Sequence, residues 1–314
     1  MRIVEYDEAD PAGVFALNLL SLEWSLTPER VALIRRLDPR PFPFFALYAV
    51  EDDCVAGQVG VYRQPMLTIE GPEDVGGACA VCTHPSFNRR GIAARLLEET
   101  HARMRAAGLR FSTLGTARHR AAYSVYRRQG YEDLFATTST FARLESVARE
   151  ASLRAERAGT ERLALADAFF PLAAAGGLGF ARRHAGFIAM MAAIGDVQPD
   201  DVWLIWDGRE MVGYAMAKMV ESALTVGDLL LLQGVDAAQA VAALVQALQP
   251  AYVRVRIHRP SVAASLRRAG YPAERPDWST FMVKPLAPDV TTDDARRLFA
   301  VGTERFLISS IDVT

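Results

Sequence analysis

The chain has 314 residues, and its 35 Lys and Arg against 37 Asp and Glu give a net charge of −2. This balance excludes a strong basic field, so we expect neither nucleic acid nor a membrane as a partner. No apolar run approaches the length that spans a bilayer, and the N-terminus does not resemble a signal peptide. Three cysteines give no disulfide framework, and we therefore expect a cytoplasmic protein.

The first 145 residues predict a mixed α/β domain. Apolar patterns typical of strands cover 1–6, a hairpin over 43–66, and then 76–83, 110–116 and 136–144, and helical patterns cover 13–25, 27–37, 92–106 and 120–131. Thr27 followed by Pro28 is a typical helix start. The strand at 76–83 is apolar on both faces, so we expect it near the middle of a mostly antiparallel sheet.

The second half repeats this order of elements. Two strands around a polar turn at 201–220 are followed by a strand, a helix, a strand and a short helix that ends in Gly-Tyr, as the helix at 123–131 does. This similarity predicts an internal duplication with a period of about half the chain. We therefore expect a domain at 1–145, a linker at 146–170, a second domain at 171–285 and a C-terminal tail at 286–314.

Cys79 and Cys82 form a C-x-x-C pair inside the strand at 76–83. Residues three apart on a strand point to opposite faces, and no second pair follows to complete a zinc site. We therefore expect no metal or redox centre.

A basic turn, Asn88-Arg89-Arg90-Gly91, lies between this strand and the following helix. The first amides of a helix have no partners within it and bind anions readily. Arginines at this end oppose the helix dipole, so they do not stabilise the helix by themselves. The turn therefore indicates a site for a phosphate group.

The turn resembles motif A of the GCN5-related N-acetyltransferases (GNAT), Q/R-x-x-G-x-G/A, which stands here as Asn88 to Ala93. A second motif of the family, N-x-x-A-x-x-x-Y-x-x-x-G-F, is matched by His119, Ala122, Tyr126, Gly130 and Tyr131. His119 replaces the family's Asn, and Tyr131 replaces its Phe.

The resemblance implies acetyl-CoA as co-substrate and assigns roles to named positions. The pyrophosphate would bind the amides of Arg89, Arg90, Gly91, Ile92, Ala93 and Ala94, and the pantetheine would pair with Val81, Cys82 and Thr83. His119 and Ala122 belong to the same cofactor site by their motif. Tyr126 would protonate the leaving sulfur.

The residue that removes the proton of the acceptor stays open. Glu23 and Trp24 lie in the helical region that lines the acceptor site in the family, and His84 follows the strand at 76–83. A chain of waters is an equal alternative. The acceptor itself is expected to be an amine of a small molecule or a peptide, and the oligomeric state cannot be predicted.

The second half lacks the working residues of the first. Asp236 lies where motif A would begin and would cap its own helix, and Leu266 replaces the catalytic tyrosine. We therefore expect a degenerate GNAT-like domain that shapes the acceptor site or packs on its partner, without doing chemistry. Intact motifs in the first half resemble the enhanced-intracellular-survival type more than mycothiol synthase, in which the second half is usually active.

These observations predict an N-acetyltransferase of the tandem GNAT type. The alternative is a protein that binds or senses acyl-CoA without catalysis, and a structural tandem domain without ligand is a weaker option. Replacing Tyr126 distinguishes an enzyme from a sensor, because only an enzyme has turnover to lose.

Overall fold

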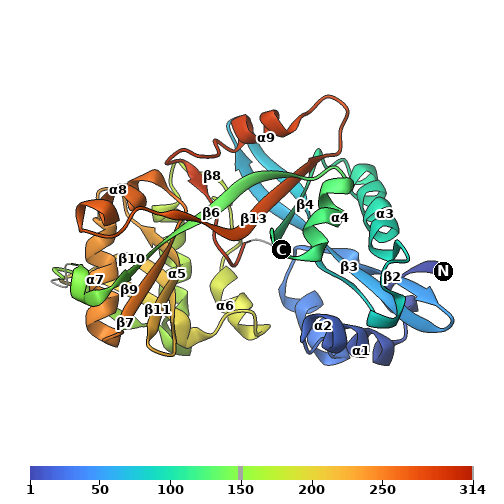
Figure 1. The fold of residues 1–314 in the computed structure, drawn as a ribbon, viewed down its shortest axis with the longest axis horizontal. Helices are drawn as coiled ribbons and strands as arrows, with labels where there is room; N and C mark the ends of the chain where they lie inside the picture. The colour runs from blue at the N-terminus through green and yellow to red at the C-terminus, as the bar shows by residue number, and fades with distance from the viewer. Residues whose placement is uncertain (148–150, 313–314) are drawn as a thin grey trace.

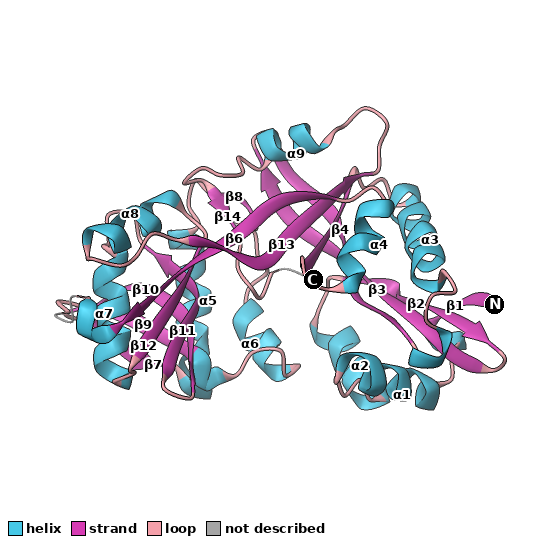
Figure 2. Cartoon of the chain, viewed as in Figure 1, coloured by secondary structure: helices cyan, strands magenta, loops and turns pink. Residues whose placement is uncertain are grey.

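The computed structural model describes residues 1–147 and 151–312 and contains one sheet that runs through both halves of the chain (Figure 1). The strands follow the order β1-β2-β3-β4-β5-β13-β6-β12-β11-β10-β9-β7, and β8 and β14 pair off this path. In both halves, helices flank the strands of the sheet (Figure 2). The architecture is the mixed α/β, tandem arrangement that the sequence predicted.

The first half forms the elements expected of it. Its strands are β1 (Arg2–Glu5), β2 (Pro41–Glu51), β3 (Cys54–Thr68), β4 (Gly71–Thr83), β5 (Phe111–Ala117) and β6 (Glu132–Arg143), and its α-helices are α1 (Pro11–Leu22), α2 (Pro28–Leu37), α3 (Ile92–Ala106) and α4 (Ala121–Arg128). The side chain of Thr27 accepts a hydrogen bond from the amide of Arg30 at 3.3 Å and so caps α2 as predicted. In α3 the expected apolar stripe is buried, including Leu96, Leu97 and Met104.

The second half repeats the pattern. Its strands are β7 (Arg154–Arg157), β8 (Leu178–Gly179), β9 (Val202–Asp207), β10 (Glu210–Val220), β11 (Ala223–Leu231), β12 (Tyr252–Ile257), β13 (Arg275–Pro285) and β14 (Phe306–Leu307), and its α-helices are α5 (Gly159–Ala173), α6 (Phe187–Ala193), α7 (Ala237–Leu248), α8 (Pro260–Arg268) and α9 (Thr292–Leu298). The expected linker at 146–170 thus contains β7 and most of α5. The domain boundaries at 145, 170 and 285 remain a prediction.

The two halves exchange their last long strands. β13 lies between β5 and β6 of the first half, and β6 in turn pairs with β12 of the second half. Figure 1 shows β6 and β13 crossing together from one half to the other. The sequence analysis did not identify β13, whose first residues, Arg275-Pro276-Asp277, are typical of a turn. Neither half therefore completes its sheet alone.

A shared apolar core also joins the halves. It contains Val14 and Leu17 of α1 and Ile34 of α2, together with Phe169 of α5 and Phe187 of α6. Separate cores lie under α3 in the first half and under α7 in the second. Burial of this much apolar surface between the halves favours a fixed relative position.

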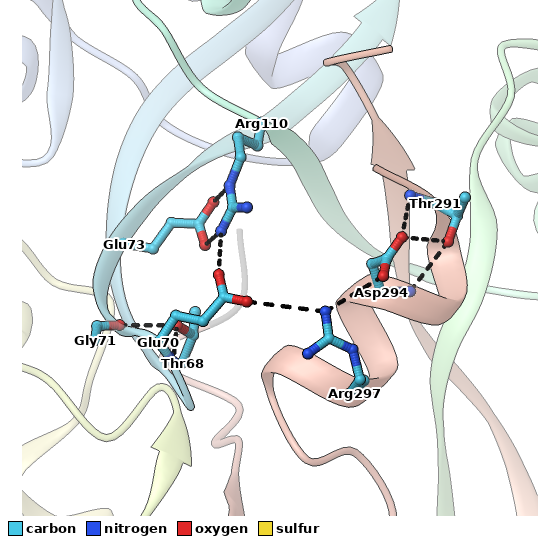
Figure 3. A network of polar contacts seen from close by, with 8 residues as sticks. All are labelled: Thr68, Glu70, Gly71, Glu73, Arg110, Thr291, Asp294 and Arg297. Atoms are coloured by element: carbon cyan, nitrogen blue, oxygen red, sulfur yellow. Dashed lines mark hydrogen bonds and ion pairs between the residues drawn. The ribbon is translucent and has the colours of Figure 1, made fainter. Parts of the chain in front are cut away.

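The C-terminal segment packs back on the first half. Helix α9 buries Leu298 and Phe299 in a core beside β13, and the carbonyl of Leu298 accepts a hydrogen bond from the amide of Ile69 at 2.9 Å. On the surface, Glu70 lies between Arg110 and Arg297, 3.5 Å and 3.8 Å from their Nη2 atoms (Figure 3). Exposed ion pairs of this kind contribute about 0–1 kcal/mol each, so the apolar contacts determine this packing.

Within the described ranges, no helix is long and apolar enough to cross a membrane.

Candidate active site

The basic turn before α3 forms an open, uncapped helix start. Gly91 has a φ of 76° and is the N-cap residue, without a side-chain hydrogen bond to the first amides. Arg89 also has a positive φ, 63°, which is uncommon for a residue with a side chain. Arg90 lies 3.2 Å from Glu51 and over the ring of Phe87, whereas Arg89 makes no side-chain contact among the described residues. The first amides of α3 thus stay available to an anion.

Strand β4 carries a bulge next to this turn. Gln58 pairs with Cys82 and Gly60 with Cys79, so β4 has two residues opposite one residue of β3. Ala80, within the bulge, has a φ of 47°. A bulge of this kind turns backbone groups out of the ladder, where they are free to bind a ligand.

Two buried amide side chains form hydrogen bonds with each other, and one of them also bonds to the backbone of the bulge. Asn18 of α1 and Gln58 of β3 exchange hydrogen bonds of 2.8 and 3.1 Å, and Gln58 Nε2 donates to the carbonyl of Ala80 at 3.2 Å. Both side chains are buried. The sequence analysis did not single out Asn18, although a polar residue inside the apolar run 16-ALNLL-20 is the signal that marks it.

A cleft of about 440 Å³ opens where β4 and β5 separate. These parallel strands pair only at Gly76 with Ser112 and Gly77 with Thr113. Beyond these pairs, residues 78–81 of β4 and 115–117 of β5 line the cleft. The volume is in the range of small-molecule sites.

Tyr126 of α4 lines this cleft, as does Ala122. The tyrosine is 6% exposed, and burial raises the pKa of its phenol to about 12. Its hydroxyl makes no hydrogen bond to a described residue, so it is a protonated donor without a partner in the protein. His119, in the same motif, lies outside the cleft lining with its ring against Trp278, at 5.4 Å between ring centroids.

The other residues expected at the cofactor strand divide between cleft and core. Val81 lines the cleft, whereas Cys82 and Thr83 are not among its lining residues. Burial raises the pKa of both Cys79 and Cys82 to about 12, which keeps the two thiols protonated. Within the described residues no group of three His, Cys, Asp or Glu side chains is placed to hold a metal ion.

The acceptor candidates from the first half lie away from this cleft. Glu23 ends α1 with a φ of 54°, and Trp24 packs under the guanidinium of Arg30. His84 accepts a hydrogen bond from the amide of Ser86 at 3.2 Å and so stabilises its own turn. Among the described residues that line the cleft, none of these three is present, and only the adjacent Leu22 is.

The second half supplies the remaining wall. Arg256 and His258 at the end of β12, residues 279–281 of β13 and residues 308–310 of the C-terminal segment line the same cleft. The strand exchange brings β12 and β13 to this position. Sequence reasoning missed all of these residues, because their relation to β4 depends on pairing across halves.

His258 is held by an acidic neighbour. Its Nδ1 lies 3.6 Å from Oδ1 of Asp228 on β11, and Asp228 accepts hydrogen bonds from the amide of Ser310, at 2.9 Å, and from the Ser310 hydroxyl. Burial lowers the pKa of His258, against the opposing effect of Asp228. The imidazole is therefore neutral near pH 7 and able to accept a proton.

A buried ion pair fixes the chain beyond Ser310. Arg183 binds both carboxylate oxygens of Asp312, at 2.8 and 2.7 Å, and also donates to the hydroxyl of Tyr214 at 2.9 Å. Its side chain and that of Asp312 are each 5% exposed. The pair thereby positions residues 308–310 at the cleft.

Comparisons with known proteins agree on the fold. Residues 3–133 match the family model described as an acetyltransferase (GNAT) domain. Among solved structures, the GCN5-related N-acetyltransferase from Anabaena variabilis is 16% identical, with 91% of this chain and 73% of that chain covered and a TM-score of 0.66. Eis1 from Mycobacterium abscessus is 15% identical, with coverages of 91% and 74% and a TM-score of 0.55.

A tandem GNAT protein from the clavulanic acid biosynthesis pathway is similar over its whole length. It is 12% identical, with 92% of this chain and 99% of that chain covered and a TM-score of 0.56. No curated protein sequence matches the chain. At these identities the structural likeness concerns the fold, and it extends over both halves.

Proposed function

We propose that the protein transfers an acetyl group from acetyl-CoA to the amine of an acceptor, because residues 3–133 match the model of the GNAT acetyltransferase domain. The single observation that carries this proposal is the cleft between β4 and β5, which joins the β4 bulge, Tyr126 and His258 in one space. Acetyl-CoA would supply the activated thioester. The acetyl specificity and the individual roles below are part of the proposal.

The residues present fit both the pyrophosphate of this co-substrate and its pantetheine arm with the thioester. The uncapped start of α3, with Gly91 and the basic side chains of Arg89 and Arg90, suits a pyrophosphate. The bulged backbone near Ala80 suits hydrogen bonding to the pantetheine and to the thioester oxygen. An amide directed at that oxygen would stabilise the negative charge that develops on it, an effect worth roughly 3–4 kcal/mol in other acyl-transfer enzymes.

Two side chains would move protons. We assign His258 as the base that takes a proton from the ammonium of the acceptor, since the imidazole is uncharged and lies on the cleft wall. Once the carbon–nitrogen bond has formed, Tyr126 would donate its proton to the sulfur as the carbon–sulfur bond breaks, and the second proton that the nitrogen loses would restore the phenol. The assignment of His258 departs from the expectation that the second half does no chemistry.

Calorimetric titration with acetyl-CoA tests the proposal, followed by an acceptor screen that detects released CoA thiol. One site per chain is expected, and Arg90→Glu should weaken it at least about tenfold, since the substitution places a carboxylate beside the phosphates. Arg209→Glu, on the turn between β9 and β10, makes the same charge change on another turn of the chain and should bind as the parent does.

The alternative, a protein that binds or senses acyl-CoA, predicts the same titration and no turnover with any amine. Binding unaffected by Arg90→Glu would overturn the assignment of the site to the start of α3. Binding with no released thiol across the screen would favour the sensor.

A further inference from the structure

The charges that line the cleft are of one sign. Arg120 at the start of α4 and Arg256 on β12 line it, and among its described lining residues there is no Asp or Glu. The rest of the polar lining consists mainly of hydroxyl side chains. An acceptor with several positive charges would meet repulsion here, whereas an anionic group would be attracted.

Arg256 has unused hydrogen-bonding capacity. Its Nε is buried without a hydrogen-bond partner, and its nearest carboxylate oxygen, on Asp277, is 3.7 Å away. Asp277 already accepts hydrogen bonds from Arg254 at 2.7 Å, from Ser139 at 3.1 Å and from the amide of Ser279 at 2.7 Å. Other donors thus satisfy the carboxylate of Asp277, and Arg256 lies within ion-pair range of it while its Nε–H stays available to a ligand.

The other acids near the cleft have hydrogen-bond partners of their own and are not among its described lining residues. Asp133 accepts from Thr280 at 2.8 Å and pairs with Arg118 at 3.1 Å. Asp228 accepts from Ser310 and lies beside His258. No hydrogen bond or ion pair joins the side chain of Arg120 to a described residue. Arg120 and Arg256 therefore place positive charge on both halves of the cleft wall, with no carboxylate among the described lining residues.

We propose that the acceptor is a small amine that also carries a carboxylate, and that Arg256 binds this carboxylate. A planar guanidinium and a carboxylate form two parallel hydrogen bonds, which orient the acceptor as well as attract it. The cleft of about 440 Å³ must hold the thioester end of the donor together with the acceptor, so an amino acid or a molecule of similar size fits and a folded protein does not. The carboxylate stays unchanged, while the amine forms the new bond to the acyl carbon. This inference rests on the proposed function.

The test compares acceptors that differ only in the carboxylate. The common L-amino acids, their carboxamides and spermidine are offered with saturating acetyl-CoA, and kcat/KM is measured by released thiol. We expect at least one amino acid to exceed its carboxamide about tenfold or more, and spermidine to react poorly. Arg256→Gln should raise KM for that amino acid about 10- to 100-fold and leave the carboxamide nearly unchanged.

Control variants separate recognition from folding. Arg256→Lys keeps the charge without the planar fork and should restore part of the preference. Arg275→Gln removes an exposed charge at the start of β13, outside the cleft, and should leave both acceptors unchanged. Thermal melting and calorimetry with acetyl-CoA report whether each variant is folded.

The failure of this inference differs from the failure of the proposed function. Equal kcat/KM for amino acids and carboxamides, efficient acetylation of spermidine, or a preference that survives Arg256→Gln would overturn the carboxylate site while acyl transfer itself stands. No transfer to any compound, with acetyl-CoA bound, would overturn both.

Discussion

Nε2 of His101 lies 2.9 Å from the hydroxyl of Tyr131, and the same hydroxyl lies 2.6 Å from Oγ of Ser112. On its other side, Nδ1 of His101 is 3.1 Å from the ammonium of Lys284 on β13. The lysine can only donate, so Nδ1 accepts and Nε2 carries the proton that it donates to Tyr131. A chain of hydrogen bonds thus runs from the exchanged strand into the first half. The hydroxyl that Tyr131 contributes to this chain explains why a tyrosine stands where the GNAT motif has Phe.

Tyr131→Phe should lower the free energy of unfolding by about 1–3 kcal/mol, because it leaves the buried Nε2–H of His101 without an acceptor and removes the hydrogen bond between Tyr131 and Ser112. Chemical denaturation at pH 7 measures this loss. A variant as stable as the parent would show that the hydroxyl is dispensable and that the ring alone explains the residue.

The stability of the protein should fall in acid through His101. Burial, with the charges of Lys284 and Arg105, lowers the pKa of His101 to about 3, against roughly 6.5 in an unfolded chain. Between these values the unfolded state binds more protons, so this group's contribution is complete above about pH 6.5 and is lost as the pH falls toward 3. The slope from this group is at most about 1.4 kcal/mol per pH unit.

His101→Gln keeps a donor and an acceptor in similar positions and removes the titration. Denaturation curves between pH 4 and 7 should therefore show a weaker pH dependence in the variant. If the two proteins lose stability in parallel, His101 does not contribute to the acid sensitivity.

Tyr126→Phe should reduce kcat about 10²- to 10⁴-fold, the range for loss of a general acid, and keep the affinity for acetyl-CoA within about twofold. The phenol has no hydrogen-bond partner among the described residues, so the melting temperature should change little. Tyr123→Phe, on the same helix but outside the cleft lining, is the matched control and should retain turnover. Full activity in Tyr126→Phe would show that the tyrosine packs in the fold and is not the general acid.

His258→Gln tests the proposed base through a pH profile. Burial, together with Arg256 and Arg259, lowers the pKa of His258, whereas Asp228 and Asp277 act in the opposite direction. Because only the neutral imidazole accepts a proton, kcat/KM of the parent should decline in acid, at a pH lower than the ordinary histidine pKa of about 6.5. The variant should be about 10²-fold slower at pH 7 and should lack this decline.

Asp228 would act as a positioning residue, so Asp228→Asn should shift the decline toward lower pH because the charge that favours protonated His258 is lost. If both variants keep the pH profile of the parent, water or another group, and not His258, removes the proton of the acceptor.

How far the fold follows from sequence depends on how local the signal is. Thr27, the apolar stripe of α3 and the Gly-Tyr end of α4 and α8 all act within a few residues, and each element formed where predicted. β13 was missed because its Arg-Pro-Asp start is typical of a turn, and its strand conformation depends on pairing with β5 and β6.

The sequence alone predicted the donor side of the proposed site. The turn at Arg89 to Gly91 and the spacing that places Tyr126 on α4 are contiguous motifs, and their chemistry can be read from residue types. The proposed acceptor side depends on tertiary structure, because Arg256 and His258 reach the cleft where β12 pairs with β6, and Ser310 reaches it on the C-terminal segment. Pairing between strands more than 100 residues apart leaves no local pattern, since it depends on which edges meet after both halves have folded.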